Sequence, residues 1–541
     1  MARKGLSGMA SEAAARLAAL LTEHKQRSGL SYEQLGRKVH SSRSTVHRYC
    51  TGRNVPATFA PIEAIATACG ASRDDLAKLY RSWERADLGD AAIRDTTLGT
   101  DTVVREAGVA IPDRRRPLPK VALAAVLGVV LLAGGAMANP PDRQASGTIP
   151  VVQAAMWTNA PRAIEPEFVG VTANSNTGQM PSFGVGSVRL WNTRTRWQNL
   201  EPSRGRYDWA TLERLVTGAR GAGLPVTLTF GGTPLWASPN SPKSVYTDDS
   251  RTGPPDDLAD WERFVRAVAE QYRGRIDAYE LWDMANHQDF FSGSMAELVE
   301  MTRLASQAIK AADPDATVVC PSMGELWDPA AFDELRQFAR LGGYDHCAAA
   351  AVKLAPRNDS DPPETMLPLA WEIEKALQEA GAGVRLWSTG SAYDVNRQQP
   401  VDADRGAQHA ARFFLSGLYA QYRRMYFYNW GSAKIPIVLQ PVGGPHTKAA
   451  RHVERLNEWL KGSRIHSCGQ GREAGLPDHL WQCRFDQGGR NFLIWWTIDR
   501  SDRIPSAPGT TSVERLDGTG MPIEPGADVT VTGSPILLRL G

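Results

Sequence analysis

Apolar positions recur with different periods in different parts of the chain. Through residues 1–85 they recur every three to four positions, which is typical of short amphipathic helices. Between residues 166 and 455, short apolar runs alternate with helical stretches, the pattern of parallel β/α units. From residue 456 on, short strand-like runs are separated by turn clusters such as Asp517-Gly518-Thr519-Gly520, which predicts an antiparallel β-sandwich. Residues 121–138 differ from all of these because they are apolar throughout.

The central region contains eight strand-like runs. They are Phe168–Ala173, Ser187–Trp191, Pro225–Phe230, Ala278–Trp282, Thr317–Cys320, Cys347–Leu354, Val384–Trp387 and Met425–Tyr428. Eight strand and helix units predict a TIM barrel, in which functional side chains lie at the carboxyl ends of the strands. Aromatic residues occur at or just beyond these ends: Trp191, Trp236, Trp282, Trp387, Tyr428 and Trp430. Any one of them fits core packing, but together they predict a rim on which sugar rings stack.

Residues 31–49 carry the local signals of two short helices joined by a turn. Ser31 is the expected N-cap, and Gln34, three residues later, completes a capping box. The second helix, from Ser42 to Tyr49, is lined with Ser, Arg, Thr and His side chains. A tight turn between two such helices is typical of a helix-turn-helix.

Residues 14–80 resemble the Cro/repressor type of helix-turn-helix, through LGRKVHSSRSTVHRYCTGRNVP and the following ACGAS. In that family the second helix enters the major groove of DNA. The resemblance implies groove contacts from Ser42, Arg43, Ser44, His47 and Arg48, and phosphate contacts from Gln34 and Arg53. The match departs at two turn positions, where His40 replaces the usual Gly and Ser41 replaces an apolar residue.

DNA is therefore the expected partner of this region, and because such repressors usually work as dimers, the chain is expected to pair. The alternative is a protein-docking module, as in helix-turn-helix folds on some membrane proteins. Those modules tend to lack a basic recognition helix, whereas this one keeps Arg43 and Arg48.

The apolar run at residues 121–138 predicts a single membrane-spanning helix, since a helix of this length spans about 27 Å. Arg114, Arg115, Arg116 and Lys120 precede it, which places the N-terminus in the cytoplasm and the C-terminal domains outside the cell membrane. A cleaved signal peptide is the alternative, because Ala136-Met137-Ala138 resembles a cleavage site. A long preceding domain argues against it.

Composition adds little to this division. A net charge of +2 argues against a broadly polyanion-binding surface, so any DNA contact must come from a local patch. No Cys or His cluster indicates a metal site, and no cofactor motif is present. Cys468 and Cys483 are expected to form a disulfide, whereas Cys320 and Cys347, in apolar runs, are expected to be buried thiols.

The central region resembles the clan A glycoside hydrolases, nearest the β-xylosidase and iduronidase group. The resemblance is carried by VRLWNTRTRWQNLEPSRGRYDWATLERLV, LTFGGTPLWAS and YELWDMAN. In that clan a general acid/base Glu ends strand four in a W-N-E-P-type motif, and a nucleophile Glu ends strand seven in a W-x-T-E motif. Here the frames read Trp282-Asp283-Met284 and Trp387-Ser388-Thr389-Gly390, so Met284 and Gly390 occupy the two positions.

Met284 cannot act as the general acid/base, because a thioether cannot protonate a leaving group. Gly390 cannot act as the nucleophile, because Gly has no side chain to attack an anomeric carbon. Other carboxylates near strand ends are Glu280, Asp283, Glu201, Glu325 and Asp394, of which Asp283 is the best placed. The favoured interpretation is a pseudoglycosidase that binds a glycan. The residues expected to bind it are Arg189, Trp191, Trp236, Trp282, Asp283, Asn286, Trp387, Tyr428 and Trp430.

The sequence thus predicts a membrane-anchored transcriptional regulator that senses a carbohydrate or cell-envelope glycan. The alternatives are an anchored glycoside hydrolase with non-standard carboxylates, and a scaffold that makes protein contacts at both ends. The expected segments are a helix-turn-helix domain (1–85), a cytoplasmic linker (86–119), a transmembrane helix (120–138), an external stalk (139–165), a TIM barrel (166–455) and a β-sandwich (456–541).

Overall fold

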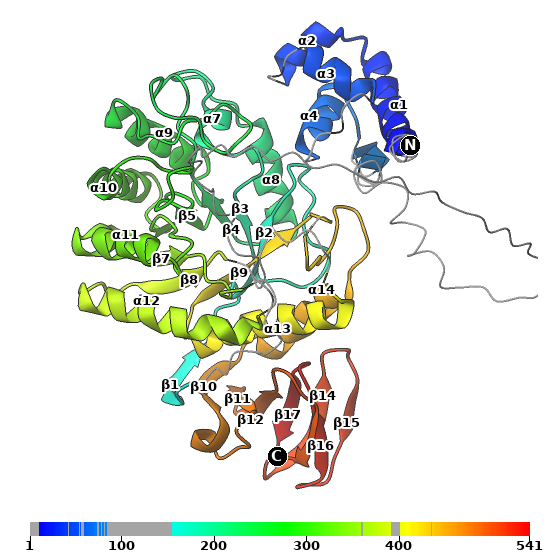
Figure 1. Cartoon of the computed structure of the whole chain (residues 1–541), viewed down its shortest axis with the longest axis vertical. Coiled ribbons are helices and arrows are strands. Elements are labelled where there is room, and N and C mark those ends of the chain that lie inside the picture. Colours follow the sequence, from blue (N-terminus) through cyan, green and yellow to red (C-terminus); the bar gives the residue numbers. More distant parts are fainter. Residues whose placement is uncertain are drawn as a thin grey trace, which may run out of the picture.

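The computed structural model shows three folded parts: a small helical region, a β/α barrel and a C-terminal β-region (Figure 1). It describes residues 10–83 and 154–541, with gaps at residues 40, 42, 53–54, 56–58, 73–74, 77, 80–81, 359–360, 391–400 and 434.

The helical region contains α1 (Ala10–Ser28), α2 (Tyr32–Lys38), α3 (Arg43–Cys50) and α4 (Ala60–Ala68). Ser31 caps α2, and the predicted capping box with Gln34 is present. The helices pack around a buried core that comprises Leu17, Leu21, Leu35, Val46, Ile62 and Ile65, among others. Between α2 and α3 the Ser41 amide donates to the Gly36 carbonyl at 2.8 Å, which holds the turn. The predicted helix-turn-helix fold is confirmed.

The predicted membrane topology is corrected. No helix of the described residues is both long enough and apolar enough to cross a membrane. The longest of them, α1 and α10 (Met295–Ala312), carry charged side chains such as Glu23 and Arg303. The predicted transmembrane helix at 120–138 lies outside the described residues. A single-pass fold class, a membrane partner and a cell-membrane localisation with extracellular C-terminal domains are therefore not supported.

The barrel is a closed ring of eight parallel strands. They are β2 (Val169–Ala173), β3 (Ser187–Leu190), β4 (Val226–Thr229), β5 (Ala278–Glu280), β6 (Thr317–Val319), β7 (Ala349–Val352), β8 (Arg385–Ser388) and β9 (Arg424–Trp430). Each strand lies within or overlaps one of the eight predicted runs, so the predicted barrel is confirmed. Most strands are apolar and buried on both faces, as parallel strands covered by helices must be.

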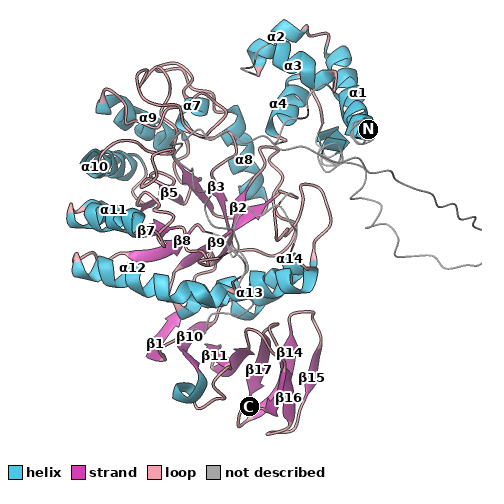
Figure 2. Cartoon of the chain, viewed as in Figure 1, coloured by secondary structure: helices cyan, strands magenta, loops and turns pink. Residues whose placement is uncertain are grey.

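Helices cover the outside of the barrel (Figure 2). They are α7 (Trp197–Leu200), α8 (Ala210–Gly221), α9 (Leu258–Gln271), α10, α11 (Pro329–Arg340), α12 (Leu367–Glu379), α13 (Ala403–Tyr419) and α14 (Lys448–Leu460). On α9, for example, Trp261, Phe264, Val265 and Val268 are buried at the helical spacing that the sequence shows.

The C-terminal region contains a seven-stranded sheet in the order β1-β10-β11-β12-β17-β14-β15 and a two-stranded sheet, β13-β16. The bounds are β1 (Trp157–Ala163), β10 (Arg464–Gln470), β11 (Trp481–Gln487), β12 (Arg490–Trp496), β13 (Asp502–Pro505), β14 (Thr510–Arg515), β15 (Gly520–Pro522), β16 (Asp528–Val531) and β17 (Ile536–Leu540). The pairing is antiparallel. Strand β1 comes from the segment that the sequence indicated as a stalk, and it pairs with β10.

Buried polar contacts connect the barrel to this β-region. Arg412 of α13 donates to the carbonyl oxygens of Thr497 and Ile498 at 2.8 and 3.0 Å. Glu364 lies 3.4 Å from the Arg412 guanidinium and accepts a hydrogen bond from Trp496 at 2.8 Å. The ion pair of Arg412 and Glu364 is fully buried, which ties the two parts into one body.

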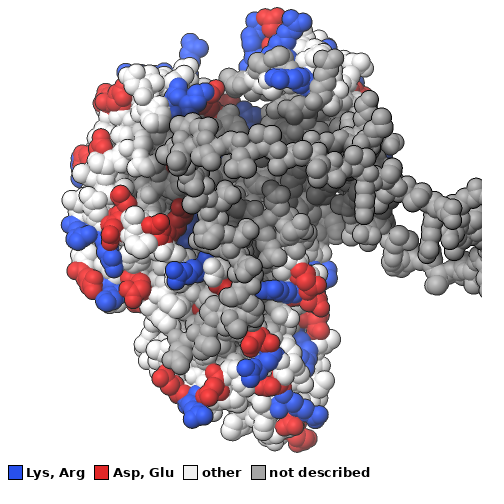
Figure 3. Space-filling model, viewed as in Figure 1, with Lys and Arg blue, Asp and Glu red and all other residues white. Residues whose placement is uncertain are grey.

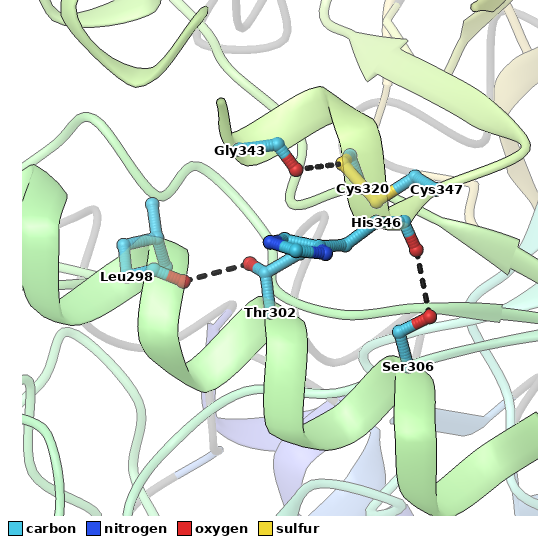
Figure 4. Close-up of a disulfide and its surroundings, with 7 residues drawn as sticks. All are labelled: Leu298, Thr302, Ser306, Cys320, Gly343, His346 and Cys347. Atoms are coloured by element: carbon cyan, nitrogen blue, oxygen red, sulfur yellow. Dashed lines mark hydrogen bonds between the residues drawn. A yellow bond between two sulfur atoms is a disulfide. The ribbon is translucent and has the colours of Figure 1, made fainter. Parts of the chain in front are cut away.

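Two disulfides are present. Cys468 of β10 is joined to Cys483, the residue opposite it on β11. Cys320 is joined to Cys347, where the sequence indicated separate thiols, because neighbouring barrel strands bring the end of β6 beside the start of β7. Figure 4 shows this bond next to α10, where Ser306 donates to the His346 carbonyl at 2.7 Å.

Candidate functional site

A buried charge cluster lies at the carboxyl ends of β3 and β5. Arg189 of β3 donates through Nε to Glu280 Oε2 at 2.6 Å and through Nη2 to Glu280 Oε1 at 3.0 Å. The same Nη2 donates to Asp283 Oδ1 at 2.6 Å. Thr229, at the end of β4, donates to Glu280 at 2.6 Å. Arg189 and Glu280 are fully buried, so this pair is part of the barrel's interior.

Lys353 extends the cluster toward β8. It follows β7, and its ammonium donates to Asp283 Oδ1 and, at 3.0 Å, to Thr389 Oγ1. Ser322 also lies 3.4 Å from Asp283 Oδ1. The cluster therefore contains two carboxylates, Glu280 and Asp283, balanced by two cations, Arg189 and Lys353.

The pKa values of these groups reflect burial and pairing. Burial acts to raise the pKa of Glu280, but the charges of Arg189 and Lys353 outweigh it and lower that pKa. Burial acts to lower the pKa of Arg189, yet Glu280 and Asp283 raise it above its ordinary value. For Lys353, burial and the neighbouring Arg189 lower the pKa, and Asp283 and Glu280 only partly oppose them. Of these three groups, Lys353 is the one whose charged form the surroundings disfavour.

Met284 directly follows Asp283 at the end of the fourth barrel strand. Its φ is 51°, a left-handed conformation that is uncommon for a residue other than Gly. Its sulfur lies 2.1 Å from where a Cβ on Gly324 would be, so a side chain at position 324 would require the Met284 side chain to move. The position that the resemblance assigns to an acid/base is filled by a thioether packed against the next strand's loop.

Gly390 follows β8, the seventh barrel strand, with no space for a side chain. A Cβ on this residue would lie 2.2 Å from the Leu354 carbonyl oxygen and 2.6 Å from the Leu354 amide nitrogen. Both are backbone atoms, which cannot rotate away. The position that the resemblance assigns to a nucleophile is thus closed to any residue larger than Gly in this backbone.

Three aromatic rings gather at the ends of β3, β4 and β5. Trp191 lies edge-on to Tyr246 at 5.4 Å and 6.3 Å from Phe290, and Tyr246 lies 5.7 Å from Phe290. All three are only partly buried. Arg196 lies over the Tyr246 ring at 3.9 Å and fixes it in place.

The other aromatic residues predicted to line the rim differ in how deeply they are buried. Tyr428 is partly buried, and burial raises its pKa, with Asp283 contributing. Trp236 is partly buried and donates to the Glu201 carbonyl at 2.9 Å. Trp282, Trp387 and Trp430 are between 1% and 3% exposed, so protein already covers their ring faces.

Asn286 also serves the structure. Its amide donates to the Gly324 carbonyl at 2.8 Å and accepts from the Gly324 amide at 2.8 Å. It thereby fastens the loop after β5 to the loop after β6.

In the helix-turn-helix region, α3 presents Arg43 and Arg48 to solvent. His47 packs edge-on against Tyr32 at 5.0 Å, and the Gln34 side chain accepts from the Ser31 amide at 2.8 Å in the capping box. Ser42 and Arg53 lie outside the described residues, and Ser44 is placed in α3 by its backbone alone. Elsewhere the visible charges alternate in sign over the barrel and the β-region (Figure 3).

The sequence did not indicate four residues of the site: Lys353 and Thr389 in the charge cluster, and Tyr246 and Phe290 beside Trp191. Lys353 is the one charged residue of the run CAAAAVKL, and a charge near the end of an apolar strand was the available signal. In the described part of the chain, no group of three or more His, Cys, Asp and Glu side chains is arranged to hold a metal ion.

Known proteins resemble two parts of the chain. Residues 16–79 match the family model of a helix-turn-helix domain. No curated protein sequence matches the chain.

Solved structures resemble the barrel and the β-region. A family 39 glycoside hydrolase from Bacteroides cellulosilyticus WH2 matches with a TM-score of 0.52 and 16% identity, over 70% of this chain and 82% of that one. A GH30 endoxylanase from Clostridium papyrosolvens C71 matches at 0.50 and 12%, over 72% and 100%. A monomeric β-xylosidase from Caulobacter crescentus CB15 matches at 0.50 and 12%, over 71% and 97%. At these identities the likeness shows a glycoside hydrolase-like fold and nothing finer.

Proposed function

We propose that this chain is a DNA-binding transcriptional regulator whose barrel binds a carbohydrate without hydrolysing it. The observation that carries the proposal is the state of the barrel's carboxylates. Glu280 and Asp283 are both tied to Arg189, and Asp283 is tied to Lys353 as well. Retaining hydrolysis needs one free nucleophilic carboxylate and one acid/base about 5 Å apart.

The two assigned positions add to this argument. Met284 cannot donate a proton, and the Leu354 backbone leaves no space for a side chain at position 390. An acid/base group alone typically contributes about 10²–10⁴-fold to the rate. A barrel that lacks both groups but keeps Trp191, Tyr246 and Phe290 partly exposed retains the means of stacking on a sugar.

A glycan array and a hydrolysis assay on the full chain test the carbohydrate half. We expect binding to at least one glycan and no turnover of an aryl glycoside panel. A Trp191→Ala variant should weaken the binding, whereas Trp209→Ala, which removes a ring stacked on Tyr207 at 4.8 Å, should not. Turnover that disappears in Asp283→Asn would instead support a hydrolase with non-standard carboxylates.

Selection of binding sites from random duplex DNA tests the other half. The full chain should enrich a sequence, with an affinity that falls as salt rises because phosphate contacts release counterions. Arg43→Ala on α3 should weaken binding, while Arg16→Ala, exposed on α1, is the matched control. Equal effects of the two variants, or no enriched sequence, would favour the protein-docking alternative. Dimerisation stays a prediction, which sedimentation on the selected DNA would test.

A further inference from the structure

Lys353 lies between the two strand ends that carry the assigned catalytic positions. Its ammonium contacts Asp283, the neighbour of Met284, and Thr389, the neighbour of Gly390. The exposed fraction of its side chain is 16%, against 4% for Asp283 and 1% for Arg189. It is therefore the charged group of the cluster that solvent and small molecules reach most easily.

Gly324 leaves space beside the Lys353 side chain, and Gly390 lies against the backbone of the residue that follows Lys353. A Cβ on Gly324 would lie 3.2 Å from Lys353 Cγ, and a Cβ on Gly390 would meet the backbone of Leu354, the residue after Lys353. The Lys353 side chain thus lies beside position 324, which carries no side chain. Met284 lines the same glycine and gives this part of the site an apolar wall.

The surroundings suit a nucleophilic amine. A lysine becomes a nucleophile when burial and nearby cations disfavour its ammonium form. Burial and Arg189 act in that direction on Lys353. Asp283 is in hydrogen-bonding contact with the nitrogen and is positioned to accept its proton.

We infer that Lys353 captures a sugar covalently, by forming a reversible imine with the carbonyl carbon of an open-chain aldose or ketose. The inference rests on the carbohydrate-binding role proposed above and gives it a ligand class. Asp283 takes a proton from the ammonium, and the freed amine adds to the carbonyl carbon. The resulting alkoxide takes the proton from Asp283 to give a carbinolamine.

The hydroxyl group then leaves as water with a proton that Asp283 carries from the nitrogen, and the electron pair left on the nitrogen forms the C=N double bond. One ammonium and one carbonyl give one protonated imine and one water, without an oxidant or a reductant. The positive charge stays on the Lys353 nitrogen, so the balance with Asp283 and Glu280 is unchanged. Because the iminium nitrogen is still positively charged, its ion pair with Asp283 is kept, and Asp283 is not left buried without a cation.

Reductive trapping on the full chain tests the inference. The chain is incubated at pH 7 with D-glyceraldehyde, a three-carbon aldose, and sodium cyanoborohydride, and modified lysines are mapped by peptide mass spectrometry. A lowered pKa raises the fraction of a lysine that is neutral at pH 7. Lys353 should therefore be alkylated faster than the exposed Lys375 and Lys461. Modification at the same rate as those two, or slower, overturns the inference.

Two variants refine the result. Lys353→Arg keeps the charge next to Asp283 but forms no imine, so labelling at the site should be lost while the unfolding transition is retained. Asp283→Asn should slow the labelling of Lys353 and leave Lys375 unaffected, whereas unchanged labelling would contradict the proton-accepting role. Glycan-array binding without trapping would refute the imine alone, because array glycans are attached through their reducing ends. Trapping without array binding would refute the broader glycan role and retain the capture of small sugars.

Discussion

Replacing Gly390 by Ala tests whether the Leu354 backbone excludes any side chain from the position where the resembled family has its nucleophile. The added Cβ would lie 2.2 Å from the Leu354 oxygen and 2.6 Å from the Leu354 nitrogen, far inside van der Waals contact. Since these are backbone atoms of a neighbouring strand end, relief requires movement of that strand end. Overpacking of this kind costs about 1–3 kcal/mol, occasionally more. For a domain of this size that corresponds to about 2–4 °C in Tm per kcal/mol.

Gly383→Ala is the matched control, because Gly383 precedes the same strand and a Cβ there meets nothing within 4 Å. Thermal and urea unfolding of the two variants would be followed by tryptophan fluorescence. We expect Gly390→Ala to be less stable than Gly383→Ala by the amount above. We also expect the double variant with Glu at positions 284 and 390 to hydrolyse no aryl glycoside. Equal stability of the two alanine variants would refute the reasoning, since position 390 would then have room for a side chain.

Three further predictions concern the buried charges. Arg189→Met should destabilise the barrel by about 3–5 kcal/mol in urea unfolding, because it leaves Glu280 buried without its main partner. Stability should fall as pH is lowered through and below about 4.3, the ordinary pKa of Glu, because the folded pKa of Glu280 is lowered and its contribution is present only above that range. A urea midpoint that does not change between pH 6 and pH 3 would contradict this. Arg412→Met should lower the unfolding midpoint and expose Trp496 fluorescence to quencher, because it leaves Glu364 buried without its cation.

Local sequence signals predicted the elements well. The eight barrel strands are apolar runs bounded by polar turns. A parallel strand that is buried on both faces requires apolar residues at almost every position, so its sequence is easily recognised. The Ser31 capping box acts within four residues, so the sequence contains all of its determinants. Strand β1 was not predicted, because its partner strand, β10, lies about three hundred residues away along the chain.

Contacts between strand ends could not be predicted in the same way. Asp283 and Lys353 are 70 residues apart, and no period in the sequence links them. The same holds for the Cys320–Cys347 bond and for the Leu354 backbone beside Gly390. The exposure of the aromatic side chains could not be predicted either, because a position at a strand end does not decide whether a ring is buried. Trp191 is partly exposed and Trp282 is buried, although each falls at the end of a predicted strand.

The balance of charge at the barrel mouth limits what the site can bind. Every carboxylate of the cluster already has a cation, and each cation has a carboxylate. A charged ligand would have to compete for a partner inside the protein, and leaving a buried charge unpaired costs several kcal/mol. A neutral sugar avoids that penalty, since its hydroxyl groups both donate and accept hydrogen bonds. The same balance explains how Lys353 could react with a carbonyl while the site remains intact: the iminium keeps the charge that Asp283 requires.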